Sequence, residues 1–486
     1  MPTPRAVVGR GLRVGCLTGL ACFVGCRDTA APVRPPIIGD VSMTSGANNV
    51  LSAEARFTAR DADSARGICD DGNGDRAVTP FVDLTAGAAR IVVLGLLASR
   101  HYACSIDVRG RVAILSAPVS VTTSELPSPI RSLRLRADHH ASPGLTLVAP
   151  LLPDVTPESI GYLVAFDSAG DIRWYQALPG VWPIEAKQLP NGHITVYAGR
   201  SYGFQQADGQ FLELAATGQT IRTYSLGGSS FTDPHELLLT FDDTTLVAEH
   251  MLGYDIRPFD LSAFGGAAVT PLAVHFIERR TAGGDVQFHW SAGGLFTPRD
   301  WPLVPTPAVD LDHPSSLAID GEGNYIVSFQ AMSEVTRIDS RTGAVLWRLG
   351  GRHNEFAFQG DPLGGFSGQH HVQVLPNGHL LLLDDQLHLF AAPARAVEYV
   401  LDPVNKVATL VWQYQPASPI ISPIMGSVQR LRSGATLIGF GAAGRVVEVG
   451  PEGSVTWEAR LTSSDGVPVA FYRAIRMVSL YRYASP

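Results

Sequence analysis

Residues 366–385 have the sequence Phe366-Ser-Gly-Gln-His370-His371-Val-Gln-Val-Leu-Pro-Asn-Gly-His379-Leu-Leu-Leu-Leu-Asp384-Asp385. A histidine pair opens an alternating strand, a Pro-Asn-Gly turn follows, and the chain returns as an almost wholly apolar run. Such a turn between two β-type runs is a strong hairpin signal. The apolar return indicates a strand that is buried on both faces.

This pattern recurs from about residue 130 onward, in units of roughly 45–60 residues. The apolar return strands are expected at residues 194–197, 325–328, 380–383 and 436–439. Each unit then has an outer hairpin with a Gly-x-x-x-Trp segment or a looser version of it. The six outer strands contain Trp174, Tyr224, Trp290, Trp347, Trp412 and Trp457.

Four strands in each unit are typical of a β-propeller, and six outer strands predict six blades. A seventh blade is left open by the long, irregular third unit, at about residues 233–292. The first unit lacks a clear first strand, while residues 471–480 form a first strand with no unit after it. We therefore expect the C-terminal segment to complete the first blade and remove the exposed edges.

The N-terminal residues 1–26 have the features of an export signal. Arg5, Arg10 and Arg13 precede an apolar run at residues 14–25, which is too short for a comfortable membrane span. The ending Phe23-Val-Gly-Cys26 resembles a bacterial lipoprotein signal, in which the cysteine is lipidated, although Leu is usual where Phe23 stands. An ordinary secretory signal is the alternative. Residues 27–36 are expected to form a flexible tether.

Residues 37–127 are predicted to form a small β-sandwich accessory domain. Leu97 followed by Tyr102-Ala-Cys104 resembles the tyrosine corner of immunoglobulin-like and fibronectin type III domains. Cys69 and Cys104 are the only cysteines outside the signal, and an exported chain most often pairs two such residues. Two separately buried thiols are the alternative. Residues 130–486 would then form the propeller.

Composition excludes one class of partner. The formal net charge of the chain is -8 and no basic cluster is present, which argues against nucleic-acid binding. The 49 glycines, 34 prolines and only 17% charged residues fit many short strands joined by turns. No later apolar run is long enough to span a membrane, so a membrane association would come from the N-terminal lipid anchor.

Three units open with a histidine near the start of the first strand, namely His235, His313 and His370. The first strands of a propeller line its central channel, so residues at equivalent positions of different blades converge on the axis. Three imidazoles at one phase of the repeat therefore predict a site. They could bind a metal such as zinc, or provide a nucleophile with electrophilic helpers, and the spacing alone does not decide between these.

The propeller region, about residues 130–480, resembles the bacterial PAPS-independent arylsulfotransferases. The most specific portion is 309–385, with the run Ile338-Asp-Ser-Arg-Thr-Gly-Ala-Val-Leu-Trp-Arg-Leu-Gly-Gly351, then Phe366-Ser-Gly-Gln-His370 and Leu375-Pro-Asn-Gly378. The resemblance also covers the plan of a small β-sandwich before a six-bladed propeller. It implies sulfuryl transfer from an aryl sulfate to a phenol, without a metal, cofactor or nucleotide donor.

The resemblance assigns roles to the three histidines. His370 falls on the transiently sulfated nucleophile, and His235 and His313 fall on two histidines that bind and polarise the sulfuryl group. An imidazole is a competent nucleophile near neutral pH, and the transition state is loose and anionic, as in phosphoryl transfer.

The sequence departs from the family pattern at two positions. Gln330 stands where the family has an arginine, and Ser315 stands where it has an asparagine. Gln can donate hydrogen bonds but brings no charge. Arg352 or Arg395 could reach the site from elsewhere. We expect Gln330, Ser315 and Ser427, which is in phase with the histidines in the sixth unit, to contact the substrate.

Other polar residues receive structural assignments. His371 should point to the opposite face of its strand, and Asp384 and Asp385 are expected to make turn hydrogen bonds. Glu236 could orient the neighbouring imidazole. The remaining histidines, His275 among them, follow no usable pattern, and most of them are predicted at the surface or in turns.

Four functions are compatible with the pattern. The leading hypothesis is an arylsulfotransferase-like enzyme, exported to the periplasm or cell surface of a bacterium. A non-catalytic propeller lipoprotein that binds ligands or envelope partners is the main alternative, and Gln330 favours it. A metal-dependent hydrolase or lyase using three histidines is the third. A quinone-dependent dehydrogenase ranks last, because channel histidines do not suit a quinone and its calcium. The natural donor, the acceptor and the oligomeric state are not indicated.

Overall fold

The computed structural model describes residues 34–85, 87–138, 141–152, 159–200, 209–243, 245–300, 309–387 and 392–481. The predicted signal with Cys26, and most of the predicted tether, lie outside these residues. The described part is nearly all β-structure, with one short helix, α1 (Ser128–Arg131), and two 3-10 turns, η1 (Ser262–Phe264) and η3 (Gly441–Ala443). None of the described helices is long and apolar enough to cross a membrane.

The N-terminal part contains two antiparallel sheets whose apolar faces share one core. One sheet has the order β1-β2-β6, and the other has the order β4-β3-β7-β8, with β5 beside β3 and β9 beside β7. Their bounds are β1 Ile37–Ser45, β2 Ser52–Arg60, β3 Ser64–Asp70, β4 Arg76–Val78, β5 Val82–Asp83, β6 Gly87–Leu94, β7 His101–Arg109, β8 Ala113–Leu115 and β9 Val119–Thr122.

Two predicted features of this N-terminal part are present. Cys69 on β3 lies opposite Cys104 on β7, and the two form a disulfide inside the core. The hydroxyl of Tyr102 accepts a hydrogen bond from the backbone N–H of Leu97 at 2.8 Å, and Tyr102 is 1% exposed. The predicted disulfide is thus confirmed.

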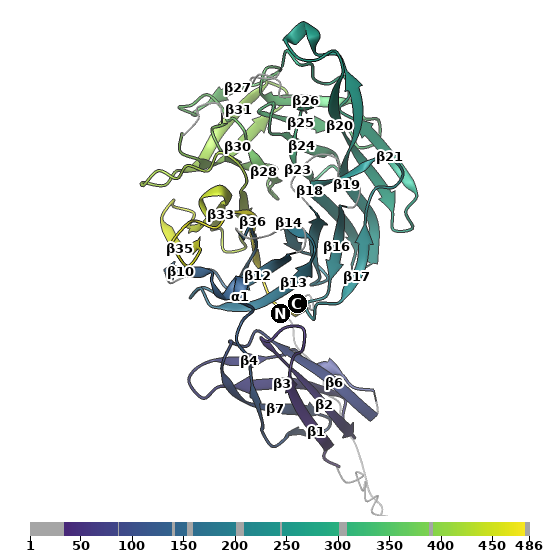
Figure 1. Ribbon diagram of the computed structural model, residues 1–486, viewed down its shortest axis with the longest axis vertical. Coiled ribbons are helices and arrows are strands. Elements are labelled where there is room, and N and C mark those ends of the chain that lie inside the picture. The colour runs from purple at the N-terminus through teal and green to yellow at the C-terminus, as the bar shows by residue number, and fades with distance from the viewer. Residues whose placement is uncertain are drawn as a thin grey trace, which may run out of the picture.

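The remainder of the described chain forms six sheets that each contain four neighbouring antiparallel strands. Figure 1 shows these sheets arranged around a common centre above the purple N-terminal part, with β14, β18, β23, β28 and β36 toward the middle. The arrangement is propeller-like. The bounds of the first three sheets are β11 Leu145–Pro150, β12 Ile160–Phe166, β13 Ile172–Pro179 and β36 Phe471–Met477; β14 Trp182–Gln188, β15 Ile194–Gly199, β16 Gln210–Leu214 and β17 Thr220–Tyr224; and β18 Phe231–Asp242, β19 Thr245–Phe259, β20 Thr270–Thr281, β21 Val286–Ser291 and β22 Val309–Asp310.

The last three sheets follow the same plan, and two of them carry an additional strand. Their bounds are β23 Pro314–Ile319, β24 Tyr325–Phe329, β25 Glu334–Ile338 and β26 Val345–Gly350; β27 Ala357–Gln359, β28 His370–Val374, β29 Leu380–Asp384, β30 Arg395–Asp402 and β31 Val407–Tyr414; and β32 Ser427–Arg430, β33 Thr436–Phe440, β34 Arg445–Val449, β35 Val455–Thr462 and β10 Arg134–Asp138. Every predicted return strand is the second strand of a sheet, and its residues are buried because neighbouring sheets cover both faces.

The two ends of this region are joined by hydrogen bonds. As predicted, the C-terminal β36 pairs with β11 and supplies the inner strand of the first sheet. A second link was not predicted: β10, which precedes the first sheet in the chain, pairs with β35 at the outer edge of the last sheet. Two links between the beginning and the end of the region leave fewer unpaired strand edges there.

The N-terminal sheets are fixed to the first sheet of the propeller-like region. The side-chain amide of Asn49 donates to the carbonyl of Tyr175 at 2.8 Å, and Arg173 forms an ion pair with Asp75 at 2.6 Å. The backbone N–H of Leu94 donates to the hydroxyl of Tyr481 at 2.6 Å. Figure 1 shows the N-terminal part below the six sheets, next to α1 and β13 and away from their centre.

Candidate active site

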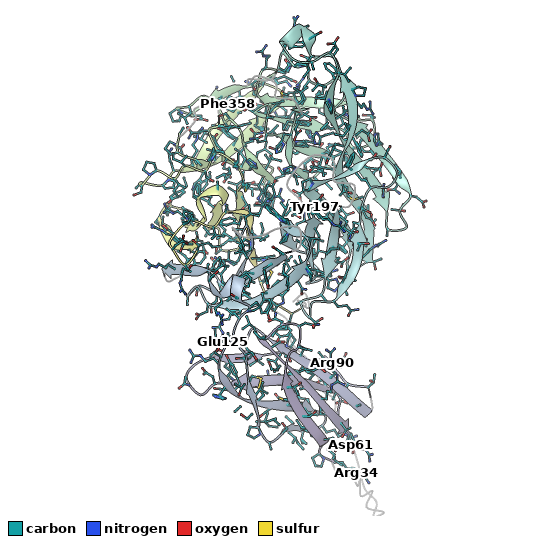
Figure 2. All side chains as sticks on the ribbon, viewed as in Figure 1. Arg34, Asp61, Arg90, Glu125, Tyr197 and Phe358 are labelled. Atoms are coloured by element: carbon teal, nitrogen blue, oxygen red, sulfur yellow. A yellow bond between two sulfur atoms is a disulfide. The ribbon has the colours of Figure 1, made fainter. Side chains whose placement is uncertain are left out.

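The first strands of three sheets bring His235, His313 and His370 to one central cavity of about 380 Å³. The three histidines thus lie together, as expected from their common phase in the repeat. The ring centroids of His235 and His313 are 4.7 Å apart. The apolar wall of the cavity is formed by Ile184, Tyr197, Tyr254, Ile424, Met425 and Tyr472. Figure 2 labels Tyr197 near the middle of the sheets, whereas Phe358 lies toward their periphery.

His235 is held by an aspartate two residues earlier. Strand β18 has a register shift between Thr232 and Leu237, and this irregularity turns the intervening residues out of the regular ladder. One carboxylate oxygen of Asp233 accepts hydrogen bonds from the backbone N–H of His235 at 2.9 Å and from its Nδ1 at 2.8 Å. The ring is therefore anchored through Nδ1, and Nε2 is left for chemistry in the cavity.

His313 is held in the same way by Asp310. The carboxylate of Asp310 accepts from the backbone N–H of His313 at 3.1 Å, and its other oxygen contacts Nδ1 of the ring. The φ angle of His313 is 39°, in the left-handed region that non-glycine residues adopt rarely. Strained backbone of this kind concentrates at functional sites.

His370 has a more distant partner. Its Nδ1 lies 2.5 Å from Oδ2 of Asp385, fifteen residues later, where the return strand β29 has just ended. Its Nε2 accepts a hydrogen bond from the backbone N–H of Met425 at 3.3 Å. A nitrogen that accepts has no proton, so this contact selects the tautomer with the proton on Nδ1 and a lone pair on Nε2. That lone pair is what a nucleophile needs.

Charges around the cavity shift the pKa values of His370 and His313 in opposite directions. Burial, the neighbouring His313 and His235, and the charge of Arg473 hold the pKa of His370 well below its usual range. Burial and the neighbouring Asp384 raise the pKa of Asp385 well above its usual range. Burial alone would also lower the pKa of His313, but the carboxylates of Asp310 and Asp233 outweigh it and raise that pKa. Different protonation states are the basis of acid and base roles.

A fourth histidine, His275 on β20, lies next to the aspartates that hold His235 and His313. Its Nδ1 is 2.5 Å from Asp312 and 3.6 Å from Asp310, and its Nε2 is 3.4 Å from Asp233. Among the described residues, His275, Asp310 and Asp312 are the one group of three that brings ligand-type atoms within 4.8 Å of one another. The cluster is satisfied by its own hydrogen bonds, and we assign no metal to it. His235, His313 and His370 do not form such a group, which weakens the three-histidine metal hypothesis.

Gln330 lines the cavity beside these histidines, as predicted, and is 7% exposed. Within the part of the chain that the structure describes, its side-chain amide forms no hydrogen bond. Neither arginine proposed to replace the missing charge reaches the cavity. Arg395 is buried in ion pairs with Asp361 and Asp384, and Arg352 is exposed beside a different cavity.

The predicted serine contacts are not supported by this geometry. Ser315 is fully buried, and its hydroxyl donates to the carbonyl of Gln369 at 3.0 Å. Ser427 is also fully buried and exchanges hydrogen bonds with the backbone of Ala474 at 3.0 Å. Neither lines the cavity, because the register of their strands directs both hydroxyls toward neighbouring inner strands. These two substrate-contact predictions are therefore corrected.

Two secondary assignments have opposite outcomes. His371 does point away from the cavity, where its Nδ1 accepts from the N–H of Val428 at 3.2 Å. Glu236 does not orient His235: its carboxylate pairs with Lys187 and with Arg473, and Asp233 orients the ring instead.

The carboxylates that hold the histidines were missed by the sequence interpretation. Asp385 was expected only in a turn, and His275 was expected at the surface or in a turn, yet it is 2% exposed. A local signal existed for Asp233 and Asp310, since each precedes its histidine by two or three residues. Such spacing lets one carboxylate cap both the backbone N–H and the ring.

The fold and the cavity together define a propeller-like protein (Figure 1) with three histidines in a largely apolar central cavity. The chain belongs to the arylsulfotransferase (ASST) family, whose model matches residues 185–462, more than half of the sequence. The matched region contains all three cavity histidines. No curated protein matches the chain.

Several solved structures resemble the chain weakly. A protein of unknown function from Bacteroides caccae aligns with 14% identity and a TM-score of 0.44, over 69% of this chain and 100% of that one. Virginiamycin B lyase from Staphylococcus aureus aligns with 8% identity and a TM-score of 0.33, over 68% of this chain and 99% of the other. A putative 6-phosphogluconolactonase from Bacteroides uniformis aligns with 11% identity and a TM-score of 0.33, over 84% and 99% of the two chains.

Proposed function

We propose that the protein is an aryl sulfate sulfotransferase that transfers a sulfuryl group to a phenolic acceptor through a sulfohistidine at His370. The observation that carries the proposal is the state of the His370 ring. Asp385 holds its Nδ1, the N–H of Met425 selects the lone pair on Nε2, and the cavity opens in front of it. Family membership supports sulfuryl transfer as the reaction class.

In the first half-reaction, the hydrogen bond from the N–H of Met425 to Nε2 of His370 breaks, and the freed lone pair of Nε2 attacks the sulfur of an aryl sulfate. An N–S bond forms, the S–O bond to the aryl group breaks, and the electron pair of that bond leaves with the aryl oxygen. His313, protonated beside Asp310, gives its proton to the leaving phenolate. His235 and the amide of Gln330 donate hydrogen bonds to the sulfuryl oxygens.

In the second half-reaction, a phenol replaces the released product. Neutral His313 accepts the phenolic proton, the oxygen attacks sulfur, and the N–S bond breaks to regenerate His370 and release the new aryl sulfate. The apolar wall with Tyr197, Tyr254 and Tyr472 is suited to the flat faces of both aryl groups. The cycle is ping-pong and needs no nucleotide donor.

The architecture and location belong to the same proposal. The six sheets correspond to a closed six-bladed β-propeller at residues 130–486, preceded by an immunoglobulin or fibronectin III-like sandwich at residues 37–127. Residues 1–26 would be a lipoprotein signal and Cys26 the lipidated residue, which would anchor the protein in a bacterial envelope. The disulfide between Cys69 and Cys104 fits an oxidising, exported location.

The test is phenolate release by the purified protein from 4-nitrophenyl sulfate, with and without a phenol acceptor. We expect acceptor-dependent release by the wild type and its loss in His370→Ala. His289→Gln is the matched control, because this histidine lies on β21 with half of its side chain exposed and should retain activity. Trapping of a sulfated peptide that contains His370 would identify the intermediate.

The main alternative is a propeller lipoprotein that binds ligands without transfer, which the uncharged Gln330 favours. It predicts that the wild type and His370→Ala are equally inert. A Gln330→Arg variant that also remains inert would decide for the binding protein.

A further inference from the structure

His275 lies between the aspartates that hold His235 and His313, and the mechanism above does not use it. On one side its Nε2 lies 3.4 Å from Asp233, whose other oxygen holds His235. On the other side its Nδ1 lies 3.6 Å from Asp310, which holds His313. One imidazole thus touches both carboxylates that position the cavity histidines.

The surroundings of His275 are strongly negative. Asp233 on β18, Asp310 on β22 and Asp312 just after β22 all face it, and each is buried or nearly so. The ring of Tyr254 on β19 also lies beside His275, with its centroid 5.4 Å away. Three adjacent buried carboxylates are costly unless cations offset them, and their field would oppose an anionic ligand nearby.

We propose that His275 is a positioning residue, a buried imidazolium that bridges Asp233 and Asp310 and offsets their charge, so that an anionic sulfuryl group can bind against His235 and His313. With His313 also protonated beside Asp310, two imidazolium ions face the three carboxylates. The cluster then supplies cationic donors where Gln330 supplies none. This inference rests on the proposed roles of His235 as a donor to the sulfuryl group and of His313 as the acid beside it.

The pKa directions agree with this geometry. Burial alone would lower the pKa of His275, but Asp312 and Asp310 outweigh it and raise the pKa well above the usual range. Burial alone would raise the pKa of Asp310, but His313 and His275 outweigh it and lower it. His275 and Asp310 therefore both stay charged at neutral pH.

Asp312 makes a charge-balance test possible. Among the described residues its carboxylate forms hydrogen bonds with His275 alone, and it does not line the cavity. In His275→Gln the positive charge is lost and the carboxylates remain. In the double variant with Asp312→Asn one negative charge is removed as well, so the original balance returns while the packing stays altered.

The first readout is the affinity for 4-nitrophenyl sulfate, measured by calorimetry in the His370→Ala background so that turnover is not needed. We expect His275→Gln to weaken binding about tenfold, the equivalent of one pKa unit of charge interaction, and the double variant to regain most of this loss. Asp312→Asn alone should bind as tightly as its parent or more tightly. Equal losses in all three variants, or none in His275→Gln, would overturn the proposal.

The second readout is the protonation of His275 itself, followed by nitrogen NMR of histidine-labelled wild-type protein, with His275→Gln assigning the signal. We expect both ring nitrogens to stay protonated at pH 8. A neutral His275 at that pH would refute the proposal whether or not the enzyme turns over. A wild type without acceptor-dependent transfer would instead refute the proposed function.

Discussion

The His370–Asp385 pair and the His313–Asp310 pair consist of the same two residue types in one cavity, yet their protons are arranged differently. In both pairs the carboxylate contacts Nδ1 of the ring. The pKa of His370 is held far down by burial and by cationic neighbours, whereas that of His313 is raised by Asp310 and Asp233 against the effect of burial. The first ring is suited to attack and the second to donate a proton.

The difference comes from the charges beyond each pair. His370 faces His313, His235 and Arg473, which are cationic or able to become so, and it has one carboxylate partner. His313 faces Asp310 directly and Asp233 close by, with His275 as the opposing cation. The comparison teaches that the charged groups beyond the hydrogen-bonded aspartate, more than the aspartate itself, determine whether a histidine acts as a nucleophile or as an acid.

The largest effect on turnover is expected from Asp385→Asn, which removes the carboxylate that holds the nucleophile His370. The amide offers Nδ1 either a hydrogen-bond donor or a weaker acceptor, so the tautomer with a lone pair on Nε2 loses its support. By analogy with aspartates that orient a catalytic histidine, turnover should fall on the order of 10³- to 10⁴-fold. The measurement is the single-turnover rate of phenolate release.

Asp465→Asn is a suitable control, because Asp465 lies in an exposed hairpin and bonds only locally to Ser463. It should retain the wild-type rate. If Asp385→Asn also retained it, with an unchanged melting temperature, the carboxylate would have no part in activating His370.

A smaller effect on turnover is expected from Asp310→Asn, which removes the carboxylate that holds the acid His313. Loss of the carboxylate lowers the pKa of His313, so less of the ring carries a proton at neutral pH. The rate should fall by about 10²-fold for donors with a poorly acidic phenol, the usual scale of general acid catalysis. Donors with a nitrophenol need less help and should lose less. The slope of log rate against the pKa of the leaving phenol measures this.

His313→Gln should steepen the same slope, since it removes the acid itself. An Asp310→Asn variant that slowed all donors equally would assign the carboxylate a purely structural role, and the contrast between the two pairs would then not concern proton transfer.

The wild-type pH profile of kcat/KM tests both the lowered pKa of His370 and the raised pKa of His313. His370 is active when unprotonated, and since its pKa is lowered, activity should be lost on the acid side only below the ordinary imidazole range near 6.5. His313 is active when protonated, and since its pKa is raised, activity should be lost on the alkaline side only above that range. Beyond each limb the rate should change about tenfold per pH unit. A profile with a single limb centred on 6.5 would contradict the assignment.

Much of the fold could be predicted because each repeat can be recognised from short segments of the sequence. The Pro-Asn-Gly turn with Gly378 at φ 83°, the apolar return strands and the outer aromatic strands are all properties of short segments. Two outer additions, β10 beside β35 and β27 beside β31, were not predicted. Each is short, and its place is set by a tertiary partner far away in the sequence.

The site residues that could be predicted are likewise those with a local signal in the sequence, whereas those placed by tertiary pairing were missed. His235, His313 and His370 could be predicted to meet, because they share one phase of the repeat. Asp385 could not, since its role depends on the antiparallel pairing of β28 with β29, which brings it back to His370. His275 is on the third strand of its sheet, outside the phase that was considered. Ser427 was in phase, yet its hydroxyl is used by the neighbouring inner strand.

The smallest effect is expected from Gln330→Arg, which adds to the acid's side of the cavity the cation found in the family pattern. If the carboxylate-held histidines already supply the positive charge, a guanidinium should raise the affinity for the sulfate ester by less than about tenfold. It should also lower the pKa of His313 through like-charge repulsion, so the alkaline limb of the pH profile would move to lower pH. The limb position in Gln330→Met, which keeps the length without a charge, serves as the reference. A far larger gain without a shift of the limb would mean that the cavity lacks a cation, and that His313 is not the charged member of the comparison.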